Sequence, residues 1–413
     1  MRVTLKFHFL LSAVSIAFLL CVSSIASSEQ LVTTSLSVSS GPWVGQREVL
    51  GQGANSSYSL SISDQKYRYR YKYNFEVSKE SNSENLQLDG SFLEFKSGSW
   101  NLGFGLKERH WSPSGRNSLI LSRNARPFQS FYVITDSKQT FNTKYLSWIG
   151  SWEAEVFLGS LEKNRSVEHT KIVGARFEFE PINNLEIDLV RTAQFGGKGK
   201  SESLKTLFGI VLGQNDNGDE PNQLAGLGIA YSVLKNGTES RIYAQVIGED
   251  EAGYLPTCHM YLAGFELNSI ISSIPTKFVI EGLDTVISTT PNGWCGPNTA
   301  YNNGYYPSGY THYGNVLGAS IDTASRALTV ALEHKFPFYD LMWSISKTDI
   351  NVPSLSGHRL SSKASSGYDI EIGARFKLFS SEILSLMHYQ GSELDTAGIK
   401  KGVKLSLSLS RNF

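Results

Sequence analysis

The last twelve residues of the chain, Gly402 to Phe413, read G-V-K-L-S-L-S-L-S-R-N-F and decide the fold. Valine or leucine stands at every second position from 403 to 409, and Lys404 and three serines alternate with them. A period of two predicts a β-strand with one apolar and one polar face. Arg411 interrupts the apolar face, and Phe413 ends the chain in the register of that face. The chain therefore closes on an amphipathic strand.

A terminal amphipathic strand that ends on Phe resembles the signal that bacterial outer-membrane barrels present to their insertion machinery. Phe413 is therefore a candidate membrane-assembly signal, and the barrel insertion machinery is a predicted partner. An ordinary edge strand shows the same alternation, so the rest of the chain has to decide between the two interpretations.

At the other end, residues 1–28 have the features of a secretory signal peptide. Arg2 and Lys6 precede a mostly apolar run at 9–22, and small residues at 24–28 offer a cleavage site. The apolar run is short for a transmembrane helix. We therefore expect residues 29–413 to form one exported β-barrel domain.

Removal of that signal leaves two cysteines, Cys258 and Cys295. In an oxidising compartment, two thiols predict one disulfide. Two unpaired loop thiols are the alternative, and the spacing resembles no zinc motif.

The clearest internal strand runs from Tyr67 to Val77. Aromatic residues and valine occupy its odd positions, and four charged residues and Asn74 occupy the even ones. A soluble sandwich would bury the aromatic face. A barrel in lipid would turn that face outward and place the charges in a wet lumen, because a lipid-facing Arg or Lys costs roughly 2–4 kcal/mol at mid-bilayer. A sheet that spans hydrocarbon must also close on itself, since unpaired backbone groups have no partner there.

Strand patterning recurs along the chain and predicts an all-β, antiparallel transmembrane barrel of about 18 strands. The expected strands are 55–63, 66–78, 87–96, 99–109, 128–136, 146–160, 167–180, 184–194, 224–234, 240–248, 259–267, 276–287, 309–321, 326–335, 340–350, 366–378, 381–390 and 401–413.

These assignments carry one inconsistency. With both chain ends in the periplasm, they put the long connections 195–223 and 288–308 on the periplasmic side, where turns are normally short. Either Leu31 to Val38 is an additional first strand and 309–321 does not span the membrane, or another assignment is wrong.

The most specific motif is not a strand. Residues 105–127 read G-L-K-E-R-H-W-S-P-S-G-R-N-S-L-I-L-S-R-N-A-R-P. This stretch resembles the signature of the Wzi family of capsule-assembly proteins, R-x-W-x-P-x followed by S-L-I-L-S-x-N-A-R-P. Further stretches resemble the family in the same order, at 248–256, 281–285 and 301–318. Together they cover most of the mature chain.

The resemblance implies an outer-membrane barrel that acts as a lectin for capsular polysaccharide. The residues of 105–127 suit a packed structure in the lumen or at its rim, so we expect loops to plug the lumen partly. Family members often carry a helical stretch of several tens of residues before the barrel. Here about 25 residues separate the signal from the first strong strand. We therefore expect the helical periplasmic bundle to be absent or reduced.

The candidate site residues have two interpretations, contact with polysaccharide or plugging of the lumen. Arginine offers a planar fork that pairs bidentately with a carboxylate of the wall or with an acidic sugar. An aromatic ring can stack on a sugar or belong to an interfacial girdle. The candidates are Arg109, Trp111, Arg116, Arg123, Asn124, Arg126, Tyr254, Tyr305, Tyr310 and His312.

Sequence signals for other chemistry are weak. The chain contains no G-x-S-x-G motif, its histidines are scattered, and its formal net charge is zero without a basic tract. We therefore expect no enzyme activity, metal, cofactor or nucleic-acid partner.

These observations predict a bacterial outer-membrane β-barrel with lipid and capsular or extracellular polysaccharide as its partners. The protein would retain or organise that polymer at the cell surface. A porin or oligosaccharide channel is the first alternative, and an outer-membrane hydrolase is the second.

Overall fold

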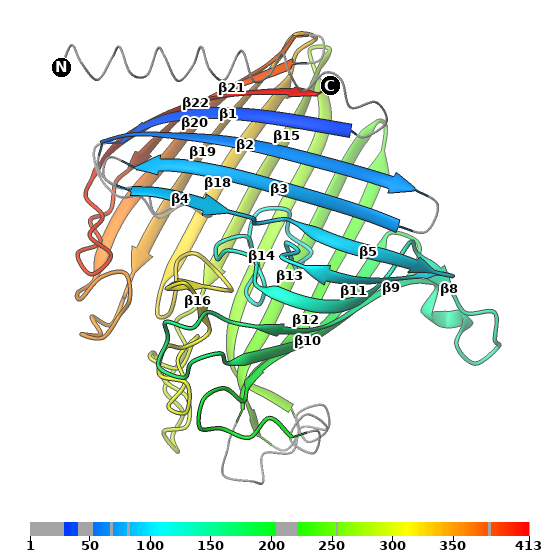
Figure 1. Cartoon of the computed structure of the whole chain (residues 1–413). Helices are drawn as coiled ribbons and strands as arrows, with labels where there is room; N and C mark the ends of the chain where they lie inside the picture. The colour runs from blue at the N-terminus through cyan, green and yellow to red at the C-terminus, as the bar shows by residue number, and fades with distance from the viewer. Residues whose placement is uncertain are drawn as a thin grey trace.

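The computed structural model is almost entirely β-sheet (Figure 1). It describes residues 29–39, 53–66, 69–80, 83–203, 221–252, 255–378 and 381–412. The described residues contain one helical element, the 3-10 turn η2 (Ser147–Ile149). No helix among them is long and apolar enough to cross a membrane.

The strands follow one another in chain order with few interruptions. They are β1 (Glu29–Ser39), β2 (Gly53–Lys66), β3 (Tyr69–Glu80), β4 (Ser83–Gln87), β5 (Phe92–Ser97), β6 (Trp100–Gly105), β7 (Gln129–Thr135), β8 (Gln139–Thr140), β9 (Ser151–Ser160), β10 (Lys171–Ile182), β11 (Leu185–Phe195), β12 (Asn222–Lys235), β13 (Thr238–Ala252), β14 (Leu255–Ile271), β15 (Ile274–Asp284), β16 (Thr311–His312), β17 (Asn315–Val316), β18 (Arg326–Lys335), β19 (Tyr339–Ile350), β20 (Ser365–Leu378), β21 (Ser381–Gln390) and β22 (Gly402–Asn412).

The main sheet closes into a barrel. Strand β1 pairs antiparallel with β2 on one side and with β22 on the other. Strands β4 and β5 both pair with β3, and β7 and β8 both pair with β9, so the twenty segments of the sheet occupy 18 positions around the barrel. The prediction of an antiparallel barrel of about 18 strands is confirmed.

The assignment of 309–321 as a spanning strand is wrong. This stretch holds only the two-residue strands β16 and β17, which form a separate hairpin. Tyr313 and Gly314 between them have φ angles of 49° and 82°, which turn the chain back on itself. Strand β1 contains Leu31 to Val38, the additional first strand that the loop lengths required.

With β1 in place, the long connections fall at one end of the barrel. Neighbouring strands run in opposite directions, so every second connection lies at the same end. Figure 1 shows loops 285–325 (yellow) and 351–364 (orange) at the lower left, opposite the connection 141–150 (teal). Outer-membrane barrels have short periplasmic turns and longer extracellular loops, so the end with long loops is the external one.

The described long connections at this external end are 106–128, 161–170, 285–325, 351–364 and 391–401.

The two faces of the barrel wall differ as the sequence predicts. In β22, Leu405 and Leu407 point outward and are about half exposed, whereas Lys404 is 7% exposed on the lumen side. Charged lumen residues pair with one another: Nε of Arg176 in β10 lies 2.8 Å from Oδ1 of Asp188 in β11. The apolar surface therefore faces lipid and the ion pairs face the lumen.

A single large apolar core fills part of the lumen. It joins Trp111 and Ile120 of connection 106–128 to Tyr301 and Tyr310 of connection 285–325. Ile247 of β13 and residues of β14 supply the wall beneath them. The lumen is therefore partly plugged by loops, as the fold class predicted.

Candidate functional site

The segment 106–128, here called the plug, leaves the wall at the end of β6, enters the lumen and returns to β7. Its two arms bond to each other. The Trp111 amide donates to the Leu121 carbonyl at 2.9 Å, and the Ser118 hydroxyl donates to the Trp111 carbonyl at 2.8 Å. The plug is thus an ordered hairpin-like unit and not a loose loop.

A buried carboxylate of the wall anchors the descending arm. Nε of Arg109 donates to Oε1 of Glu155 at 2.8 Å, and Nε1 of Trp111 donates to Oε2 of the same carboxylate at 3.1 Å. Nη2 of Arg109 also donates to the Ser130 hydroxyl at 3.0 Å. Both oxygens of Glu155 are therefore occupied by side chains of the plug, which compensates the burial of the charges.

Three aromatic rings surround the Arg109 guanidinium. Its Cζ lies 4.2 Å from the ring centre of Phe157, 5.3 Å from that of Phe128 and 5.5 Å from that of Tyr132. Cation–π attraction is strongest in such a desolvated setting. Arg109 is 7% exposed, so in this structure it serves to hold the plug.

A second carboxylate, Glu281 of β15, holds the tip of the plug. It accepts hydrogen bonds from the Ser114 hydroxyl, from Nδ2 of Asn117 at 2.7 Å and from the Tyr243 hydroxyl at 2.8 Å. Glu281 lies in one of the stretches that resembled the family, but its two partners in the plug could not be read from the sequence because they lie more than 160 positions away.

Nearby, the side chain of Gln245 in β13 bonds to the backbone of both arms. It accepts from the Leu119 amide at 2.8 Å and donates to the Trp111 carbonyl at 2.7 Å. A glutamine that satisfies two buried backbone groups fixes the register of the plug on the wall.

The ascending arm ends in a bidentate ion pair with the wall. Nε and Nη2 of Arg126 each lie 2.9 Å from a carboxylate oxygen of Asp89, in the break between β4 and β5. The Arg126 guanidinium also lies 5.1 Å from the ring centre of Tyr313. Asp89 was not among the sequence-predicted residues, since no strand pattern marks it.

The other candidates of the plug have different surroundings. Arg123 is exposed and donates to the Gly115 carbonyl at 3.1 Å. The Arg116 amide donates to the Ser114 hydroxyl at 3.0 Å, and its side chain is half-buried. Nδ2 of Asn124 donates to the Val316 carbonyl at 2.8 Å, which ties the plug to connection 285–325.

Connection 285–325, here called the cap, packs on the plug. Tyr301 and Tyr310 stack at 6.2 Å, and Tyr310 shares a 2.8 Å hydrogen bond with the Thr192 hydroxyl of β11. Tyr305 is exposed, with Nζ of Lys200 5.5 Å from its ring centre. Of the two candidate tyrosines in this connection, Tyr310 is therefore a buried packing residue and Tyr305 presents an exposed ring.

A buried ionic latch joins this cap to connection 161–170. Nδ1 of His312 donates to Oε2 of Glu162 at 2.7 Å, and Nη1 of Arg165 lies 3.5 Å from the same oxygen. Arg165 also donates to the carbonyls of Thr311 and Gly309. Glu162 was missed by sequence analysis because no period of two singles it out.

Burial raises the pKa of Glu162, but the hydrogen bond from His312 and the charge of Arg165 outweigh it, so the pKa lies below its ordinary value of 4.5. A carboxyl group whose pKa is lower in the folded than in the unfolded protein stabilises the fold at any pH above its unfolded-state pKa. This stabilisation is lost as the pH falls through the folded-state pKa. The latch should therefore weaken below pH 4.5.

This is measurable as pepsin cleavage within 285–325, expressed relative to cleavage of an unfolded peptide at the same pH, and we expect this relative rate to rise as the pH falls from about 5 to 3. Glu162→Gln should remove that rise, because an amide does not titrate there. A Glu162→Gln variant with the wild-type pH profile would contradict the latch.

A disulfide fastens the same cap to the wall. Cys258 of β14 and Cys295 of connection 285–325 are bonded, with 5.3 Å between their Cα atoms.

Two other predicted residues, Tyr254 and Phe413, lie outside the described part of the chain.

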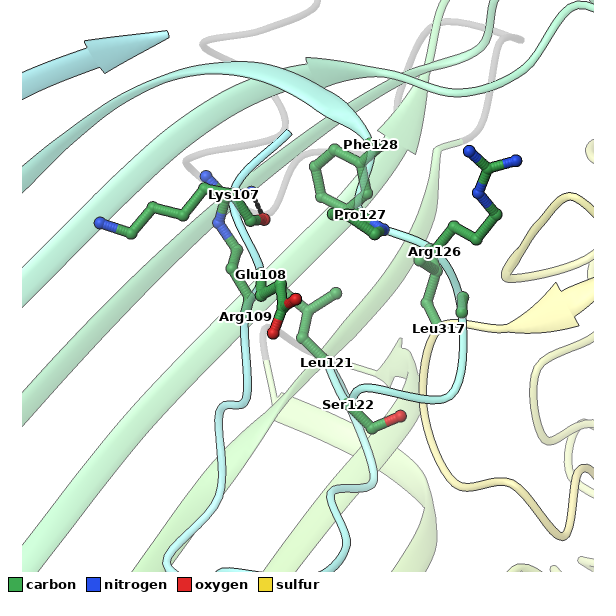
Figure 2. A pocket seen from close by; sticks show the side chains of 10 residues that line it. Lys107, Glu108, Arg109, Leu121, Ser122, Arg126, Pro127, Phe128 and Leu317 are labelled. Carbon is green, nitrogen blue, oxygen red and sulfur yellow. Dashed lines mark hydrogen bonds between the residues drawn. The ribbon is translucent and has the colours of Figure 1, made fainter. Parts of the chain in front are cut away.

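A small pocket lies between the two arms of the plug. Figure 2 shows Lys107 and Arg109 on the descending arm and Leu121 and Ser122 on the other arm, with Leu317 of the cap beside them. Its cavity volume of about 20 Å³ admits a water molecule and not a sugar ring. Within the described residues, no group of three or more His, Cys, Asp or Glu side chains is placed to hold a metal.

Comparison with known proteins gives one curated relative, an uncharacterised 55.8 kDa protein in the cps region of Klebsiella pneumoniae. It is 31% identical over 211 residues, which make up 50% of this chain and 42% of that protein. The chain thus matches less than half the length of this relative.

The solved structures that share the fold include these two. Wzi of Escherichia coli, described as a carbohydrate-binding β-barrel involved in group 1 capsule assembly, matches with a TM-score of 0.80 and 23% identity over 94% of this chain and 85% of that one. The outer membrane protein OprD of Pseudomonas aeruginosa matches with a TM-score of 0.54 and 8% identity over 94% and 93%.

The sequence profile of the family "Capsule assembly protein Wzi" matches residues 44–344, which is well over half of the chain. This range includes the plug, the latch, the disulfide and the whole of connection 285–325. The protein is a bacterial outer-membrane β-barrel that belongs to the Wzi family of capsule assembly proteins.

Proposed function

We propose that this protein is a lectin-like outer-membrane barrel that binds exported capsular or extracellular polysaccharide and retains or organises it at the cell surface. The observation that carries this proposal is the plugged external mouth. The plug is anchored on Glu155 and Glu281, and the cap is fastened over it by the disulfide and the Glu162 latch.

Such a mouth offers a fixed surface to a large external ligand. Loops that lie over a rigid scaffold commonly carry binding functions, and a preorganised surface loses less entropy when it binds. The E. coli relative by fold is described as carbohydrate-binding, which fits the same role.

The role we propose is not catalytic. The two carboxylates nearest the plug, Glu155 and Glu281, are committed to hydrogen bonds with plug side chains. An acid–base pair would need carboxyl groups that face a substrate with room for it. Binding therefore explains these residues better than hydrolysis.

Binding can be tested with protein purified in detergent micelles. The probe is polysaccharide collected from the culture supernatant of the producing strain, immobilised for biolayer interferometry. The protein should bind it in a saturable way, and an OprD-type porin in the same detergent should not. Equal signals from the two barrels would contradict the proposal.

A transport channel is the second candidate, since OprD shares the fold. Conductance in planar bilayers separates the two. We expect nearly closed wild-type channels, and larger conductance when the plug is excised by joining residue 105 to residue 129. A large, stable wild-type conductance would favour transport.

We further propose that residues 1–28 are removed as a signal peptide, that the barrel is the single domain of the mature chain, and that the barrel insertion machinery reads its last strand. Deletion of Phe413 should then lower the amount of folded protein in the outer membrane, measured as the heat-modifiable band on gels. Phe413→Tyr, which keeps a terminal ring, is the matched control. Unchanged insertion of the deletion variant would argue against the terminal signal.

A further inference from the structure

The hairpin β16–β17 presents an exposed aromatic ring in a backbone conformation that disfavours it. Thr311 pairs with Val316 and His312 with Asn315, which leaves Tyr313 and Gly314 as a two-residue turn. Both have positive φ angles, 49° and 82°. Such turns favour Asn-Gly, and a bulky residue at positive φ is uncommon. The turn geometry therefore does not explain a tyrosine at 313, whose ring centre lies 4.5 Å from that of His312.

The ring is exposed, yet the turn beneath it is held firmly. Tyr313 is 58% exposed, whereas the neighbouring His312 is 4% exposed and bonded to Glu162. Phe128 packs edge-on against the His312 ring at 6.2 Å. Backbone strain that the surroundings impose is a reason to look for function at the strained residue.

A guanidinium–carboxylate ion pair lies beside this ring. The Arg126 guanidinium is 5.1 Å from the Tyr313 ring centre and forms its bidentate pair with Asp89. In Figure 2 the Arg126 side chain points away from the pocket between the plug arms. An aromatic face next to a paired donor and acceptor matches a pyranose, whose C–H face stacks on a ring while its hydroxyls both donate and accept.

The cations nearest this ring are paired with carboxylates of the wall. Arg126 lies 2.9 Å from Asp89 and Arg109 lies 2.8 Å from Glu155, whereas Lys107, 2.9 Å from Glu94, shares that carboxylate with Arg70. A carboxylated sugar would have to compete with these protein carboxylates for the same donors. The charge balance therefore favours a sugar unit without charge.

We propose that Tyr313, Arg126 and Asp89 form a subsite for one uncharged hexopyranose unit of the polysaccharide, with the sugar ring stacked on Tyr313 outside the small pocket. This inference rests on the proposed function and specifies where the polymer is held. The strained turn is then maintained because it holds the Tyr313 ring exposed beside Arg126.

The deciding variant is Tyr313→Asn, which removes the ring and gives the turn its preferred residue. We expect the barrel to be at least as heat-stable as wild type, and its affinity for the immobilised supernatant polysaccharide to fall by about tenfold. Tyr305→Ala, at the other exposed tyrosine of the cap, should leave the affinity within about twofold.

The class of sugar is tested by competition on the same surface. Methyl glycosides of glucose, galactose and mannose are the neutral probes, and glucuronate and galacturonate are the charged ones. At least one neutral probe should displace wild-type protein at millimolar concentration, and the uronates should not. Affinity should change little between low and high salt, because no net charge drives binding.

The outcomes separate this inference from the proposed function. If wild-type protein does not bind the polymer, the proposed function fails and the subsite fails with it. If wild type binds and Tyr313→Asn binds equally well, the subsite is wrong and the function stands. Displacement by uronates alone, or strong salt dependence, would overturn the assignment to an uncharged sugar.

Discussion

Arg109→Ala should lower the free energy of unfolding by about 3–5 kcal/mol, because it breaks a buried ion pair and leaves one partner uncompensated. The partner is Glu155, whose Oε1 would lose its donor while Oε2 keeps only the indole of Trp111. The variant also empties the space between the rings of Phe128 and Phe157. Both effects act on the anchor of the descending arm.

The change can be followed by equilibrium unfolding in guanidinium with tryptophan fluorescence. Arg123→Ala is the matched control, since Arg123 is exposed on the same segment and makes one hydrogen bond to a backbone carbonyl. We expect the control to stay within about 0.5 kcal/mol of wild type. Arg109→Lys should lie between the two, because lysine keeps the charge but cannot reach Glu155 and Ser130 together.

A different result would reassign the residue. If Arg109→Ala unfolds like wild type but no longer binds polysaccharide, the guanidinium contacts the sugar and does not anchor the plug. Equal destabilisation by Arg109→Ala and Arg123→Ala would mean that burial at 109 has no special weight.

Loss of the disulfide should have an effect of similar size. The bond joins positions separated by 37 residues, and the chain-entropy model assigns about 4 kcal/mol to closing such a loop. The double variant Cys258→Ser and Cys295→Ser should therefore show a lower unfolding midpoint. It should also lose protease resistance in 285–325, because the bond fastens this loop to β14.

Wild-type protein treated with a reductant supplies the internal control, since it should reproduce the double variant without any change of sequence. The single latch variant Glu162→Gln should leave the cap in place at neutral pH while the disulfide is intact. An unchanged midpoint in both the reduced and the double-serine protein would show that the bond does not stabilise the cap.

The barrel could be predicted because each spanning strand shows its pattern within its own few residues. In lipid every spanning strand must show one apolar face, so the leucines of β22 and the tyrosines near 69–73 mark their strands without knowledge of their neighbours. The error at 309–321 has the same origin. The spacing of its aromatic residues resembles that of a strand, but Tyr310 and His312 are buried among loops and Tyr313 lies in a tight turn.

The site was predictable only in part, because its contacts join residues far apart in sequence. Arg109 and Arg126 were candidates because arginine suits carboxylate pairing. Their partners Glu155 and Asp89 lie 46 and 37 positions away, on wall segments that only barrel closure brings near the plug. Glu162 and His312 are 150 positions apart, and no periodicity links them. Such pairs require the fold.

The central claim is that this barrel holds exported polysaccharide at the cell surface. The most direct measurement is the ratio of cell-attached to shed polymer in a deletion strain, in the same strain complemented with wild type, and in one complemented with Tyr313→Asn. We predict constant total polymer with a lower attached share in the deletion strain, restored by wild type and only partly by the variant. An attached share that does not change on deletion would contradict the claim.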